Sequence, residues 1–152
     1  AAVRFEAAAG RGLAAAQHNL GQLYETGLGV TADPALARQL YRQAADNGDG
    51  EALSRLALMQ LDGRGGPADV AKAFATAERA AEIGGSLAQF TLGQFYEAGH
   101  GVDANLEQAR KLYWQAADLG LAAATERLAA LDAAAAVPDR PIRRYTPDKL
   151  DN

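Results

Sequence analysis

The sequence predicts an all-α protein, a right-handed α-solenoid superhelix of antiparallel helix-turn-helix repeats with a 36-residue period. The first observation is a series of glycines in that spacing, at Gly12, Gly48, Gly84 and Gly120. Leucines recur in the same register from Leu20 onward, and so do pairs of alanines. The third observation is the abundance of alanine, which has the highest helix propensity. Self-similarity at a fixed period of this length is the signature of a solenoid.

The first helix of a unit is predicted from Ala14 to about Thr26. Leu20, Leu23 and Tyr24 fall on one face of this helix at helical spacing. Gly27 should end the helix, because glycine readily takes a positive φ at a helix C-terminus.

The second helix is predicted to start at Pro34 and to run to about Asn47. Asp33 supplies an N-cap acceptor, and proline is favoured at the first helical position. The equivalent caps in the later units are Asp69 and Asn105, and Asn105 forms a candidate capping box with Gln108.

Two glycines interrupt the first helices, where glycine costs about 1 kcal/mol relative to alanine. These residues are Gly21 and Gly93. We expect close approach of the paired helix there, with Tyr41 or Tyr113 filling the adjacent space. The equivalent residue of the middle unit is Ala57, so that hairpin is expected to be slightly wider.

The repeat divides the chain into six segments. They are the second helix of a truncated repeat (1–13), three full repeats (14–49, 50–85 and 86–121), a C-terminal capping helix (122–136) and an extended tail or linker with proline and arginine (137–152). The second repeat is the divergent one. A chain that begins inside a repeat is expected to be a fragment of a longer protein.

The chain resembles the Sel-one-like repeat (SLR) family, a relative of the tetratricopeptide repeat (TPR) family. Two runs carry the resemblance: LGQLYETGLGVTADPALARQLYRQAADNG, from Leu20 to Gly48, and LGQFYEAGHGVDANLEQARKLYWQAADLG, from Leu92 to Gly120. The middle unit departs from the pattern at Ala57, Gln60, Gly66 and Ala77. The resemblance covers about residues 1–131. It implies scaffold roles in bacterial signalling, envelope assembly, polarity or host contact.

Composition argues against several classes of function. The net charge of −4 disfavours nucleic-acid binding, and the absence of cysteine excludes disulfides and thiolate metal sites. The only histidines are His18, on an outward position of its helix, and His100, in a turn. We therefore expect no enzyme, no catalytic residue, no cofactor and no metal. No apolar run is long enough to insert this segment into a membrane.

Side chains of the first helices that the packing does not use should line the concave face of the solenoid. Apolar residues at its centre and polar residues at its ends suit a partner-binding groove. The candidate residues are His18, Gln22, Glu25, Ser54, Leu58, Leu61, Leu87, Phe90, Gln94, Glu97 and Glu126. Trp114 is an apolar residue at a polar register position, so it is expected either under the tail, near Tyr145 or Ile142, or in a second contact patch.

These features predict a non-catalytic adaptor or scaffold that binds a protein or peptide on the concave face. Two alternatives stay open. One is a module that binds peptidoglycan or another carbohydrate, and the other is a structural spacer or a homodimerisation unit that uses the N-terminal half repeat. The compartment is unknown from sequence, with the bacterial periplasm or cell envelope favoured over the cytoplasm.

Overall fold

A computed structural model describes residues 2–10 and 12–136 of the chain. These residues form eight helices and no strand, which confirms the all-α prediction. The helices are α1 (Ala2–Ala9), α2 (Ala14–Thr26), α3 (Pro34–Asp46), α4 (Gly50–Asp62), α5 (Val70–Ile83), α6 (Ser86–Ala98), α7 (Leu106–Asp118) and α8 (Ala122–Ala135).

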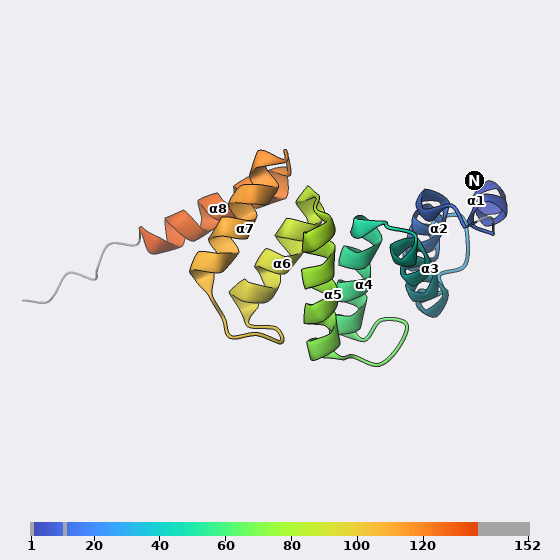
Figure 1. Cartoon of the computed structure of the whole chain (residues 1–152), viewed down its shortest axis with the longest axis horizontal. Helices are drawn as coiled ribbons and strands as arrows, with labels where there is room; N and C mark the ends of the chain where they lie inside the picture. The colour runs from blue at the N-terminus through green and yellow to red at the C-terminus, as the bar shows by residue number, and fades with distance from the viewer. Residues whose placement is uncertain (1, 11, 137–152) are drawn as a thin grey trace, which may run out of the picture.

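The helices follow one another along the long axis of the molecule, so the described chain is an elongated stack (Figure 1). Each helix packs against the next one in sequence, and α4 also packs against α6. The pairs α2–α3, α4–α5 and α6–α7 are the three hairpins, and α1 and α8 lie at the two ends. This is the one-dimensional stacking expected of a solenoid, in which each unit contacts its neighbours.

Glycines in the left-handed conformation end the first helix of each unit. Gly27, Gly63 and Gly99 have φ angles of 71°, 71° and 73°. Each glycine N–H donates to the carbonyl four residues earlier, which satisfies one of the free carbonyls at the helix end. The predicted helix ends are confirmed.

The second helices begin at the predicted cap residues. The side chains of Asp33, Asp69 and Asn105 each accept the backbone amide three residues later, at 2.9 to 3.0 Å. Only one of the two hydrogen bonds of the predicted capping box forms, the one from the Gln108 amide to the Asn105 side chain. The backbone amide of Asn105 donates to the Tyr96 carbonyl instead of to the Gln108 side chain. That bond ties the turn between the two helices back to the first helix.

Close helix approach at the mid-helix glycines is confirmed. A Cβ atom on Gly21 would lie 2.9 Å from Cε1 of Tyr41, and one on Gly93 would lie 2.6 Å from Cε1 of Tyr113. Both tyrosines are fully buried. The space that an alanine would need is therefore already filled by a ring from the paired helix.

The middle hairpin has neither member of this pair. Ala57 and Ala77 stand at the glycine and tyrosine positions, and both are fully buried. They pack in one cluster with Phe95, a fully buried ring from the next unit. The wider spacing expected for this hairpin stays a prediction.

The second glycine of the turn packs against the preceding unit in the second and third repeats. A Cβ on Gly65 would lie 2.2 Å from the carbonyl oxygen of Pro34, and one on Gly101 would lie 2.9 Å from the carbonyl oxygen of Val70. The equivalent Gly29 has nothing within 4 Å. Gly65 and Gly101 therefore make contact between units, in addition to forming the turn.

The end helices contribute apolar side chains to the stack. Phe5 and Ala9 of α1 pack in one cluster with Leu20. Leu128 of α8 is buried and Leu131 packs beside it. The capping role of this helix stays a prediction. No described helix has the length and apolarity needed to cross a membrane.

Candidate functional site

A groove lies on the side of the stack formed by the first helices α2, α4, α6 and α8, which we call the first-helix face. It has a volume of about 480 Å³. Leu58 and Leu61 of α4 contribute its apolar part, and α6 contributes Gln94 and Glu97. The remaining lining residues are Phe95, Ala98, His100, Tyr113 and Arg127. The groove thus spans helices from three consecutive units.

Glu97 links three helices at the edge of this groove. The Tyr113 hydroxyl of α7 donates to its Oε2 at 2.6 Å, and the Arg127 Nε of α8 donates to the same oxygen at 3.0 Å. A second bond joins Arg127 Nη2 to Glu97 Oε1. The hydrogen bond from Arg127 lowers the pKa of Glu97, and the bond from Tyr113 acts in the same direction. The carboxylate is therefore held ionised and in a fixed orientation.

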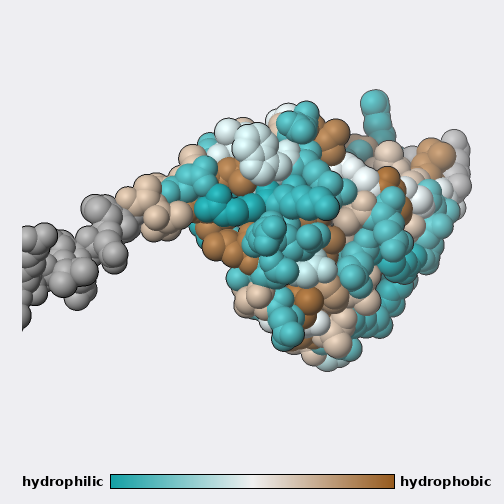
Figure 2. All heavy atoms as spheres, turned by 60° about the vertical axis from the view of Figure 1, so that its left-hand side comes forward, coloured by the Kyte–Doolittle hydropathy of each residue, from teal (hydrophilic) through white to brown (hydrophobic). Residues whose placement is uncertain are grey.

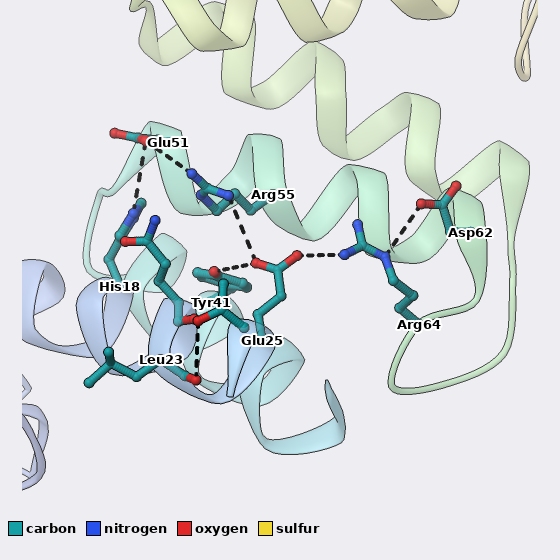
Figure 3. A network of polar contacts seen from close by, with 10 residues as sticks. His18, Leu23, Glu25, Tyr41, Glu51, Arg55, Asp62 and Arg64 are labelled. Carbon is teal, nitrogen blue, oxygen red and sulfur yellow. Dashed lines mark hydrogen bonds and ion pairs between the residues drawn. The ribbon is translucent and has the colours of Figure 1, made fainter. Parts of the chain in front are cut away.

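A similar arrangement, with two arginines in place of one, surrounds Glu25 in the first unit (Figure 3). The Tyr41 hydroxyl donates to Glu25 Oε2 at 2.6 Å, and Arg64 Nη1 donates to Oε1 at 2.6 Å. Arg55 Nη1 lies 3.8 Å from Oε2. Burial and the hydrogen bond to Glu25 raise the pKa of Tyr41, so its hydroxyl stays a donor at neutral pH.

These two polar clusters stand two repeats apart in the same register. Tyr41, Glu25 and Arg55 correspond to Tyr113, Glu97 and Arg127. In the middle unit the three positions hold Ala77, Leu61 and Thr91. The first-helix face therefore carries an apolar section between two clusters of paired charges.

The groove brings together four of the residues predicted to bind a partner, namely Leu58, Leu61, Gln94 and Glu97. Gln22 and Glu126 are exposed elsewhere on the first helices. Leu87 is half-buried, and the Phe90 ring lies 5.3 Å from the Tyr113 ring, centroid to centroid. The apolar part of the groove is therefore smaller than the sequence predicted, because the Phe90 ring packs against Tyr113 of its own unit and does not line the groove.

His18 and Ser54, which we expected on the surface, are buried. His18 is 8% exposed, with Nδ1 3.2 Å from Asp49 Oδ2 and its ring edge-on to Tyr41. The Ser54 hydroxyl donates to the Gly50 carbonyl at 3.1 Å. The outward placement of His18 was wrong, because this register position faces the start of the next first helix.

Sequence reasoning missed Arg127, Tyr113 and His100 as groove residues. The recurrence of the Tyr–Glu–Arg register two repeats apart was the signal that identifies the first two. His100 was predicted to occupy a turn, and it does so, but its ring also packs edge-on against Phe95 with centroids 6.0 Å apart.

Trp114 is 61% exposed on α7. Figure 2 shows the surface near the α7–α8 end, where hydrophilic side chains surround small separate apolar areas. Tyr145 and Ile142, proposed as its cover, lie outside the described residues, so both interpretations of Trp114 stay open.

Comparison with known proteins gives a family match over most of the chain. The family model of the Sel1 repeat matches residues 14–49, 50–85 and 86–121. These ranges coincide with the three hairpins α2–α3, α4–α5 and α6–α7.

Solved structures with the same architecture come from bacteria. A Sel1 repeat protein from Oxalobacter formigenes is 32% identical with a TM-score of 0.69, over 83% of this chain and 52% of that one. A protective antigen of uropathogenic Escherichia coli strains, with an SLR fold, is 31% identical with a TM-score of 0.72, over 92% of this chain and 30% of its own. Helicobacter pylori cysteine rich protein B is 26% identical with a TM-score of 0.55, over 60% of this chain and 69% of its own. The chain thus spans about half, or less, of the first two structures.

Proposed function

Because this chain belongs to the Sel1 repeat family, whose members generally mediate protein–protein interaction, we propose that it is a non-catalytic adaptor that binds a peptide segment of a partner protein in the groove of the first-helix face. This is the face expected to be concave. The observation that carries the proposal is the pairing of the apolar Leu58 and Leu61 with a polar edge made by Glu97 and Arg127.

The groove has the composition that peptide recognition needs. Apolar side chains supply most of the affinity when a partner side chain covers them, and fixed polar groups at the rim select its orientation. Leu58 and Leu61 are only half-buried, so part of their surface stays available to a partner. The Glu97 carboxylate and the Arg127 guanidinium are held by their mutual hydrogen bonds and lose little freedom on binding.

The test is selection from a random peptide library against the folded chain, followed by calorimetric titration of the selected peptides. A Leu61→Asp variant should lose at least about 2 kcal/mol of binding free energy, the loss typical of an interface hot spot. The matched control is Leu106→Asp, a change to a leucine that is 49% exposed on α7 and does not line the groove. Circular dichroism should show both variants as helical as the wild type.

Each outcome decides between the candidate functions. Peptides that bind the wild type and the control but not Leu61→Asp support the adaptor. Equal binding to all three chains refutes the groove assignment. Binding of cell-wall glycan fragments in place of peptides would favour the carbohydrate-binding alternative, and concentration-dependent sedimentation would favour a homodimerisation unit.

A further inference from the structure

Basic side chains without a carboxylate partner gather between α3 and α5, on the second-helix face of the stack. Ion pairs in the described part of the chain engage the guanidinium groups of Arg55, Arg64, Arg110 and Arg127. Arg38, Arg42, Lys72 and Arg79 form none with the described residues. All four line two adjoining cavities, in a chain whose net charge is −4.

The two cavities share two of the cations. The first, of about 350 Å³, is lined by Arg38, Arg42 and Lys72 together with the turn at residues 65–67. The second, of about 160 Å³, is lined by Arg42, Lys72 and Arg79. Asp46 is the one carboxylate among the described lining residues of either cavity. The positive charge therefore extends along a strip, not around a single point.

Arg38 is a nearly buried cation that, within the described residues, donates only to neutral oxygens. It is 8% exposed, and both of its terminal nitrogens donate to the Pro67 carbonyl at 3.3 Å. The equivalent Arg110 pairs with the Asp132 carboxylate of the next first helix. The position equivalent to Asp132 in the unit after Arg38 is occupied by Gln60, whose side chain is a neutral amide. Buried charges usually have a charged partner, so this position lacks a carboxylate that the third unit has.

Gln60 adds an unused hydrogen-bond acceptor to the second cavity. Its side chain is 1% exposed and lines the cavity, and its Oε1 has no hydrogen-bond partner in the described structure. Buried polar atoms are nearly always satisfied, so an incoming donor is expected. A polypeptide N–H supplies such a donor once the terminal amide rotates.

We propose that the cavities between α3 and α5 bind an acidic segment of a partner protein. Its carboxylates would lie along Arg38, Arg42, Lys72 and Arg79, and one of its backbone amides would donate to Gln60. A chain of carboxylates fits the elongated distribution of charge better than a single small anion does. This surface is independent of the groove on the first-helix face, so the two proposals can fail separately.

The test is fluorescence anisotropy with a labelled oligo-glutamate peptide at an ionic strength of about 0.1 M, where the Debye length is about 10 Å. The variant Arg42→Gln/Lys72→Gln changes two exposed cations that line both cavities. We expect it to weaken binding by about tenfold or more, because two of the four positive charges of the strip are removed. The matched control Arg4→Gln/Lys111→Gln removes the same charge from exposed sites on α1 and α7. It should leave the affinity within about twofold, since distant surface charges are screened.

Three results would overturn the proposal. One is the absence of peptide binding by the wild type. Another is an equal loss of binding in the two double variants, which would indicate general attraction to the surface. A third is displacement of the peptide by inorganic phosphate at the same concentration as by unlabelled peptide, which would indicate a small-anion site. A selective loss in Arg42→Gln/Lys72→Gln, with weak competition by phosphate, supports it.

Discussion

The ring of Tyr41 occupies the space in which a side chain on Gly21 would stand, with Cε1 2.9 Å from that Cβ position. The hydroxyl of the same tyrosine donates to Glu25 at 2.6 Å. One residue of the second helix therefore fixes both the distance between the helices and the orientation of a carboxylate on the first-helix face.

Gly21→Ala should destabilise the protein although alanine is the better helix former. The propensity gain of about 1 kcal/mol is outweighed by overpacking against Tyr41, which typically costs about 1–3 kcal/mol. In a Tyr41→Ala background the same change should become stabilising, because it then reproduces the Ala57–Ala77 pair of the middle unit. Urea unfolding of the two single variants and the double variant measures this reversal of sign. If Gly21→Ala changes the free energy of unfolding in the same direction in both backgrounds, this prediction is wrong.

Gly65→Ala should cost more stability than Gly29→Ala. Both glycines have a positive φ, 68° and 76°, so both variants carry the left-handed strain of about 1–2 kcal/mol. Only Gly65 lies against backbone, since its added Cβ would be 2.2 Å from the Pro34 carbonyl oxygen. We expect an additional loss of about 1–3 kcal/mol from overpacking. Thermal unfolding of both variants checks this difference, and equal melting temperatures would show that the turn relaxes away from Pro34.

The local features of this fold could be predicted from the sequence because they depend on nearby residues. Asp33 caps α3 and Gly27 ends α2 through contacts within a few positions along the chain. His18 could not be placed in this way. Its exposure depends on where α4 begins, because the N-cap of that helix, Asp49, lies 3.2 Å from its ring nitrogen.

The part of the candidate site that depends on a single helix could also be predicted from the sequence. Leu58 and Leu61 are found in the groove because their face of α4 follows from helical spacing. Arg127 was missed, because its approach to Glu97 depends on how the next unit is placed. The contrast between Arg110, which pairs with Asp132, and Arg38, which donates to the Pro67 carbonyl, also depends on contacts between units.

The stability of the chain should fall in acid partly through Glu97. Its pKa is lowered in the folded state, chiefly by the hydrogen bond from Arg127. A lowered folded pKa means that the stabilisation is complete above the unfolded value of about 4.3 and is lost as the pH falls through the folded value. The urea midpoint should therefore drop more steeply below about pH 4.3 in the wild type than in Glu97→Gln.

Glu126→Gln is the control for that experiment. Glu126 is an exposed carboxylate on α8 that forms no ion pair with the described residues. Its variant should keep the wild-type slope in acid. Parallel curves for the wild type and Glu97→Gln would show that the bond to Arg127 does not contribute to stability in solution.

Trp114 offers a direct probe of the C-terminal segment, because it is the only tryptophan in the chain. In a chain ending at Ala136 the indole should be quenched readily by acrylamide, as expected from its exposure of 61%. If residues 137–152 cover it, quenching in the full chain should be clearly weaker. Equal Stern–Volmer constants would reject the cover and leave Trp114 as a contact patch.

The contact between a turn glycine and the preceding unit bears on how an array of such repeats can gain further units. Gly65 contacts Pro34, and Gly101 contacts Val70 in the same way. The middle unit thus carries both halves of the joint: its turn contacts the start of α3, and the start of its own α5 receives the turn of the third unit. A tandem duplication of 36 residues would create a new joint with matching surfaces at once. Copying a whole unit therefore keeps the register of these joints, whereas an insertion within a helix that is not a multiple of the repeat would shift it.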